Sequence, residues 1–497
     1  MKSPVESAKY GPGAGSRQTS NRERQLGTLE WMTLIHVGIL VLATSWVFGG
    51  QADFVRTPLA WWGSLGGLIT LTALQDRRTR RAENLQPLRW LWPFAAFNAL
   101  VVLACLNPTL REITLEGETL LANSGGKPWF PGSARPALAL HALWLFDAVW
   151  ISSFNLALVI RQRRALRGLL LVFVANALVL AVFGTVQKLS HAKGLFFDAM
   201  PTRQPRFFAS FVYHNHWGAF MVLMMAACIA LTWHYSRRIH ARNLLHSPIF
   251  GGWVVLLLLA ATVPLSGSRS CTLLALALLG AVSAHLVRRV IEKRRHYKES
   301  IAVPLGGIGL ALVLGAGGAW FVGRETILSR LATTQNQVAD MREMGGMGDR
   351  AVLYRNTWRM AEDKLWFGWG MSSYPHVFSR LYNTRESKVD RLPVFYNDAH
   401  SDWLQSLAEH GIIGSALLAL CALVPLWQVR ISSSVGPLAG YLLIGCFLVL
   451  LYAWIEFPFG NLAVVLTWWV LFFTAVQTAR LRQREEGPAE DHKHRTT

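Results

Sequence analysis

The chain has 497 residues, of which 52% are hydrophobic and only 16% are charged. A soluble domain carries roughly 25% charged residues, and repeated apolar runs of roughly 18 residues or more exclude a single soluble core. The formal charge of +20 would suggest nucleic acid in a soluble chain. Here, basic loops at the cytoplasmic ends of membrane helices explain most of it, so no nucleic-acid partner is predicted. The runs lack the alternation of a β-barrel, which leaves an all-α polytopic membrane protein.

About twelve membrane spans are predicted, nine within residues 29–322 and three within residues 411–479. Residues 1–28 form a polar first tail, and the tail 480–497 is predicted to be disordered. The first apolar run has no cleavage pattern behind it and is read as a retained helix. The predicted spans are 29–49, 57–74, 90–107, 137–160, 168–187, 208–233, 249–265, 271–287, 301–322, 411–428, 436–455 and 458–478.

The basic loops set the orientation. They alternate along the chain so that both termini fall in the cytoplasm, and residues 323–410 become a large helical outer loop between spans nine and ten. The loop and the other outer segments then lie on the non-cytoplasmic side of the membrane. Outer segments also carry arginines that this rule does not explain. An anionic substrate outside would explain them.

The first group of candidate residues lies where the sixth span begins. Arg206 is followed by His214, Asn215, His216 and Gly218. The start of a helix favours anions, so these polar side chains are candidates for substrate binding. The alternative is an interfacial belt of amphipathic residues.

A second candidate is Arg269, in the very short turn 266–270 between two spans. An arginine this close to hydrocarbon should be paired or bind an anion. The alternative is that its guanidinium simply reaches water.

The third group lies on a helix predicted to begin at Gly348–Asp349. Arg350, Arg355 and Arg359 follow, with Arg355 and Arg359 on one face. The planar fork of arginine suits phosphate oxygens. A solvated surface helix is the plainer alternative.

The fourth group surrounds His400, between Asp398 and Asp402. Asp398 is predicted to cap a short helix that ends at Gly411. His400 then lies in the first turn, where the helix dipole disfavours protonation, and a neutral imidazole can take a proton from a hydroxyl.

No other motif signals chemistry. The sequence has no phosphate-binding P-loop, dinucleotide fingerprint, HExxH or nucleophile elbow, and the outer carboxylates form no DxD pair. We therefore predict no metal and no cofactor. Asp147 lies inside a predicted span, where pairing with a neighbouring helix is the simplest explanation.

These stretches, in this order and topology, resemble the O-antigen ligase and O-antigen polymerase superfamily of the bacterial envelope. The resemblance covers roughly residues 200–475. It rests on RFFASFVYHNHWGAF, SGSRS, DRAVLYRNTWRMAEDKLWFGWG, HSDWLQSLAEHGIIG and IEFPFGNLAVVLTWW.

The resemblance implies a GT-C-like, metal-independent glycosyltransferase that acts on the periplasmic face of a bacterial inner membrane. Its donor would be a glycan on undecaprenyl pyrophosphate, and its acceptor a sugar hydroxyl of lipid A–core or of another lipid-linked glycan. His400 matches the proposed base and Arg269 a short-turn arginine, while Arg206 or the His214–His216 group stands near another donor-binding arginine. Ala209–Ser210 departs from the family's pattern, which leaves the donor side open.

We place the donor pyrophosphate against Arg269, Arg206 and one of Arg350 or Arg355, with His400 on the acceptor hydroxyl. A polymerase of the same superfamily has the same donor chemistry and stays open. A transporter of lipid-linked glycans would use the same arginines, but the sequence shows no internal repeat of the kind transporters carry. A non-catalytic scaffold would not need this concentration of positive charge.

Overall fold

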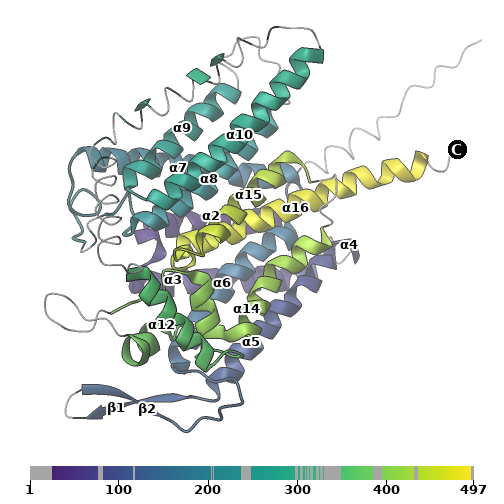
Figure 1. Ribbon diagram of the computed structural model, residues 1–497. Helices are drawn as coiled ribbons and strands as arrows, with labels where there is room; N and C mark the ends of the chain where they lie inside the picture. Colours follow the sequence, from purple (N-terminus) through teal and green to yellow (C-terminus); the bar gives the residue numbers. More distant parts are fainter. Residues whose placement is uncertain are drawn as a thin grey trace, which may run out of the picture.

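In a computed structural model, the described part of the chain is a bundle of membrane-length helices with a smaller helical region at one end (Figure 1). The structure describes residues 25–76, 82–115, 118–202, 204, 206–236, 248–296, 300, 349–383, 395–429 and 435–493, with isolated positions between 302 and 328.

Among these residues, nine helices are long and apolar enough to cross a membrane, which confirms an integral membrane protein built of α-helices. Two further helices, α3 and α15, coincide with predicted spans 57–74 and 436–455. The predicted span 301–322 lies largely outside the described residues. The helices are α2 (Thr28–Trp46), α3 (Asp53–Gln75), α4 (Ala82–Leu85), α5 (Leu91–Cys105), α6 (Pro136–Val159), α7 (Arg163–Leu189), α8 (His214–Ser236), α9 (Pro248–Ser266), α10 (Arg269–His296), α12 (Asp349–Asp363), α13 (Tyr374–Val377), α14 (Asp402–Gln428), α15 (Pro437–Tyr452) and α16 (Leu462–Lys493).

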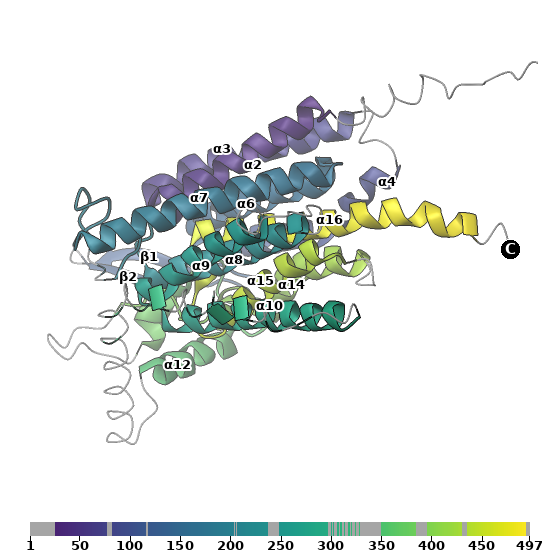
Figure 2. The ribbon, with the colours of Figure 1, turned by 90° about the horizontal axis from the view of Figure 1, so that it is seen from above.

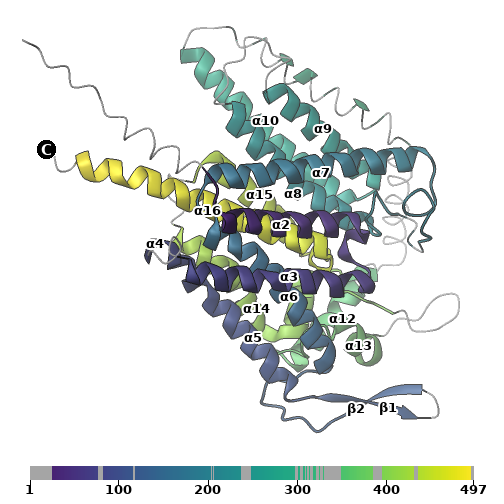
Figure 3. The ribbon, with the colours of Figure 1, turned by 180° about the vertical axis from the view of Figure 1, so that it is seen from behind.

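The helices run in similar directions, so the bundle has two ends (Figures 1 and 3). We call the end that carries α12 the loop end, and the end where α16 reaches Lys493 the tail end. The connection from α2 to α3 and that from α15 to α16 lie at the loop end. Segments distant in sequence therefore meet there.

Helix α8 is the centre of the bundle and is buried along nearly its whole length. It contacts α7, α9, α10, α15 and α16 (Figure 2). Small residues let these helices approach closely. At Gly218, for example, an added Cβ would lie 2.5 Å from the Cβ of Cys271 on α10. This packing fixes the loop end of α8 and the polar residues on it.

Asp147, the acid predicted inside a membrane span, is hydrogen-bonded to a neighbouring helix. Asn98 of α5 donates a hydrogen bond of 2.9 Å to Asp147 of α6. The predicted pairing with a neighbouring helix is confirmed.

The loop-end region has a small core of its own. Leu353, Met360, Tyr374 and Phe378 are buried together with Ala408 of α14. This core docks α12 and α13 on the loop end of α14.

A backbone break in α14 joins this region to the membrane helices. Gly411 adopts φ +64° and ψ −170°, a conformation restricted to glycine, and divides α14 into a short outer part and a membrane part. Trp369 and Gly370 donate backbone hydrogen bonds to the carbonyls of Ala408 and Glu409 just before the break. The predicted helix end at Gly411 is therefore a break, after which the helix resumes.

Two features differ from the sequence prediction. An antiparallel hairpin, β1 (Leu110–Leu115) and β2 (Glu118–Asn123), lies in an outer segment where no strand was predicted. The alternating stretch LREITL, which contains Ile113 and Thr114, favours a strand. The region 480–497, predicted to be a disordered tail, continues α16 as a helix as far as Lys493.

Candidate functional site

The site is organised around Glu456, in the turn between α15 and α16. Helix α15 ends at Tyr452, and Pro458 begins a short 3-10 helix, Pro458–Gly460, where a proline is tolerated because it needs no backbone N–H. The Glu456 carbonyl accepts a hydrogen bond from the backbone N–H of Asp402 (3.2 Å), and the Asp402 carboxylate accepts one from Phe459 N–H (2.8 Å). The turn is thereby tied to the start of α14. The carboxylate of Glu456 is buried, with the side chain only 3% exposed.

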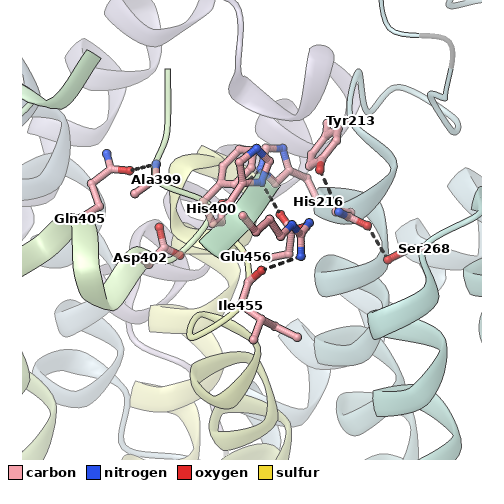
Figure 4. Close-up of polar contacts among 12 residues, drawn as sticks. Tyr213, His216, Ser268, Ala399, His400, Asp402, Gln405, Ile455 and Glu456 are labelled. Carbon is pink, nitrogen blue, oxygen red and sulfur yellow. Dashed lines mark hydrogen bonds and ion pairs between the residues drawn. The ribbon is translucent and has the colours of Figure 1, made fainter. Parts of the chain in front are cut away.

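The two oxygens of this carboxylate have different cationic or ionisable partners. Oε2 lies 3.2 Å from Nδ1 of His400, and Oε1 accepts a hydrogen bond from the guanidinium of Arg350. Arg350 also donates to the Ile455 carbonyl (3.2 Å). Figure 4 shows His400 and Ile455 on either side of the Glu456 carboxylate. Glu456 thus brings together two of the predicted site residues, His400 and Arg350.

His400 precedes α14 and has a positive φ of +51°. The helix begins at Asp402, and the hydroxyl of Ser401 accepts the capping hydrogen bond from Leu404 N–H (3.4 Å). The prediction that Asp398 caps this helix was therefore wrong, as was the placement of His400 in its first turn. The carboxylate of Glu456, and not a helix dipole, is the group that faces the imidazole.

Tyr354 fixes the backbone at this point. It lies four residues after Arg350, on the same face of α12, and its hydroxyl donates to the His400 carbonyl (2.9 Å). A non-glycine residue at positive φ persists only where its surroundings hold it. Tyr354 and the Ser401 cap supply two of these constraints.

The pKa values of the two carboxyl groups of the site, Glu456 and Asp398, are shifted in opposite directions. Burial acts to raise the pKa of Glu456, but the hydrogen bond from His400 and the charge of Arg350 outweigh it, and this pKa is lowered. Burial raises the pKa of Asp398 to about 6, although His400 and Arg56 act against it. Glu456 is therefore the group that carries a fixed negative charge beside His400.

The start of α8 forms the other wall of the site. His216 is buried, and its Nε2 lies 3.2 Å from the Phe457 carbonyl. The Phe457 ring contacts the rings of His216 and His400 edge-on and stacks on Tyr213. One aromatic side chain therefore separates the two histidines.

Asn215 links this wall to α10. It donates to the Tyr213 hydroxyl (2.9 Å) and accepts from the hydroxyl of Ser268 (2.6 Å), which precedes Arg269 (Figure 4). His214 is also buried at this helix start. The predicted polar group of α8 and the short turn before α10 are thus one hydrogen-bonded unit.

The predicted arginines lie in two places: Arg206 and Arg269 near the start of α8, and Arg350 and Arg355 on α12. Arg206 and Arg269 are exposed and flank the start of α8, because the Arg206 carbonyl accepts from His214 N–H (3.2 Å) and Arg269 follows Ser268. Arg355 is exposed as well, but it lies five residues after Arg350 and hence about 140° around α12. The structure does not bring Arg355 onto the face of α12 that meets Glu456.

Sequence reasoning did not select Glu456, Tyr354 or Phe457 as site residues. The usable signal for Glu456 was an acid inside the otherwise apolar stretch IEFPFG, followed by proline. The signal for Tyr354 was its i,i+4 spacing from Arg350. Neither spacing nor composition shows that these segments, about 100 residues apart, meet.

Within the residues that the structure describes, no group of three or more His, Cys, Asp or Glu side chains is arranged to hold a metal ion. The site instead contains a carboxylate (Glu456) in contact with an imidazole (His400) and a guanidinium (Arg350). Such a set can orient an imidazole and stabilise developing charge.

Fold and site together define an integral membrane protein with many helices and a polar site at one end of the bundle. Residues 253–419 match the family model described as O-Antigen ligase. This match supports the O-antigen ligase and polymerase superfamily for this part of the chain, and at the level of the family it implies an enzyme of the glycosyltransferase type. A comparison with curated proteins gave no match.

Proposed function

We propose that the protein transfers a glycan from undecaprenyl pyrophosphate to an acceptor hydroxyl, at the loop end and without a metal ion. The observation that carries this proposal is the buried contact of Glu456 with His400 and Arg350, beside the exposed arginines at the start of α8. The acceptor is a sugar of lipid A–core in a ligase reaction.

His400 deprotonates or positions the acceptor hydroxyl. With the Glu456 carboxylate accepting from Nδ1–H, the Nε2 lone pair is left for the hydroxyl proton. The acceptor oxygen attacks the anomeric carbon, the bond from this carbon to the pyrophosphate oxygen breaks, and the proton passes to His400. The lipid pyrophosphate leaves with the bonding electron pair.

Negative charge grows on this pyrophosphate as it leaves, and fixed guanidinium groups stabilise it. Arg206 and Arg269 suit this role because both are exposed and flank one polar helix start. Arg350 faces Glu456, so its charge positions the carboxylate and, through it, His400. Arg355 is left for the outer parts of a substrate. The sugar would lie near His214, Asn215, His216 and Asp398.

We place the loop end in the periplasm and both termini in the cytoplasm of a bacterial inner membrane, because the basic loops of the sequence favour this orientation. A periplasmic site would meet a donor lipid after the donor has crossed the membrane. The large loop-end region then covers the site from the aqueous side.

The experiment uses purified protein with a lipid-pyrophosphate glycan donor and candidate acceptors in EDTA. His400→Asn is the test variant and His191→Asn the matched control, because both positions have positive φ (+51° and +57°) and asparagine tolerates this conformation. We expect product on lipid A–core, unchanged in His191→Asn and lost in His400→Asn.

Other results have defined meanings. Lengthening of the donor glycan itself would identify a polymerase. Donor movement across vesicles with no product on any acceptor would identify a transporter. Full activity of folded His400→Asn would remove the assigned role of His400.

A further inference from the structure

A long apolar groove lies between α2 and α7, on the outside of the bundle and away from Glu456. Its volume is about 1100 Å³, above the roughly 300–1,000 Å³ of small-molecule pockets. Figures 2 and 3 show α2 and α7 side by side along this face. The groove begins at the tail end, where both helices start.

The walls of the groove follow one face of each helix. On α2 they are Trp31, Ile35 and Ile39, and on α7 Val172, all between 43% and 55% exposed. Both helices are membrane spans by length and composition. A concave apolar surface in such spans faces lipid chains and not water.

Two glycines create the hollow. Gly38 on α2 and Gly168 on α7 both line the groove, and a Cβ added at either one meets no atom within 4 Å. Elsewhere in the bundle, glycines such as Gly63 let helices touch, with an added Cβ 2.7 Å from Ala148. Gly38 and Gly168 instead leave space that protein does not fill.

The tail end of the groove is polar and positive. Gln25, Gln162 and the exposed side chain of Arg164 lie there. The start of α7 has no side-chain cap at Gln162, so its positive dipole end faces the same region. Arg163, the neighbouring arginine, is engaged by Glu485. A cation at a helix start disfavours the helix, but it suits the binding of an anion.

We propose that this groove binds one anionic phospholipid of the tail-end leaflet, with an acyl chain between α2 and α7 and the phosphate at Arg164. The apolar length, the unfilled space and the positive mouth match the three parts of such a lipid. The residues before Gln25 are polar and offer no apolar segment of the chain itself as occupant. A polyprenyl tail would also fit the walls, but under the proposed function its phosphate lies at the loop end, which would leave Arg164 unused.

The test measures lipid binding to the delipidated full chain by native mass spectrometry. The probes are phosphatidylglycerol and phosphatidylcholine with identical acyl chains. We expect saturable binding of one phosphatidylglycerol, at least tenfold weaker in Arg164→Gln, while phosphatidylcholine binding changes less than twofold. The control for charge is Arg288→Gln, an exposed arginine on α10.

Filling the groove is the second arm. Gly38→Leu with Gly168→Leu should remove the bound lipid of either headgroup without unfolding the protein, because leucine favours helix and meets open space at both positions. Gly67→Leu on α3 is the matched control, since Gly67 also has nothing within 4 Å but does not line the groove.

Three results would overturn the proposal: Arg164→Gln behaving like Arg288→Gln, the double leucine variant keeping its lipid, or undecaprenyl phosphate displacing phosphatidylglycerol with no dependence on Arg164. The last result would assign the groove to the donor's lipid tail. Transfer activity plays no part in this measurement, so its outcome is independent of the proposed function.

Discussion

Replacing Glu456 with glutamine tests whether a buried carboxylate orients the histidine of the site. The substitution keeps the shape of the side chain but removes the charge that faces His400 Nδ1 and Arg350. A hydrogen bond to a charged group contributes about 1.5–3 kcal/mol. If the His400 contact acts in the transition state, Glu456→Gln lowers kcat/KM by about 10- to 150-fold, since each 1.36 kcal/mol is about tenfold in rate.

The same carboxylate gives a pH signature. Its pKa is lower in the folded protein than the ordinary value of 4.5. A group of this kind stabilises the fold above its unfolded-state pKa, and the stabilisation is lost as pH falls through the lower folded-state value. The melting temperature of the wild type should therefore fall more steeply below pH 4.5 than that of Glu456→Gln.

The assay is single-turnover glycan transfer in micelles, with melting temperature recorded for each variant. Glu362→Gln is the control, because it removes a carboxylate of α12 that contacts Trp358 and not the site. A folded Glu456→Gln variant with wild-type kcat/KM would refute the positioning role of Glu456. An equal loss in Glu362→Gln would show that charge alone is responsible.

Three further predictions use melting temperature in detergent. Asp398→Asn should raise stability above pH 6 by about 1–3 kcal/mol and leave it unchanged below pH 4, because burial lifts the pKa of this acid to about 6 and its charged form destabilises the fold. Gly218→Val should destabilise by about 1–3 kcal/mol through overlap with Cys271, whereas Gly67→Val should not overlap with any neighbour. Gly411→Ala should cost about 1–3 kcal/mol, since a Cβ there lies 2.4 Å from Phe367 N.

Much of the fold could be predicted from sequence because membrane helices are local signals. An apolar run of sufficient length predicts a membrane helix, whatever that helix packs against. Boundaries were harder to predict. Span six was expected to begin at 208, but α8 begins at His214 because Phe208 and Phe211 pair their backbones ahead of it. Helix α14 begins at Asp402, ahead of the expected start of span ten at 411, because Gly411 absorbs a break inside the helix.

The candidate site was predictable only in part, for a related physical reason. His400 and Arg350 stood out because polar residues in an outer loop are conspicuous. Glu456 did not, because its importance comes from two partners far away in sequence. The capping role given to Asp398 failed since Ser401, one residue before the helix, supplies the hydroxyl. Local rules cannot rank two capping residues that lie three positions apart.

The position of Glu456 connects folding of the loop-end region with assembly of the site. Arg350 lies on α12, His400 precedes α14, and Glu456 belongs to the turn between two membrane helices. If the loop-end region separates from the bundle, the carboxylate loses both partners, and an unpaired buried charge is costly. Glu456 is therefore paired with His400 and Arg350 only while the loop-end region is docked on the bundle. A site assembled in this way has its histidine oriented only when the loop-end region is docked on the bundle.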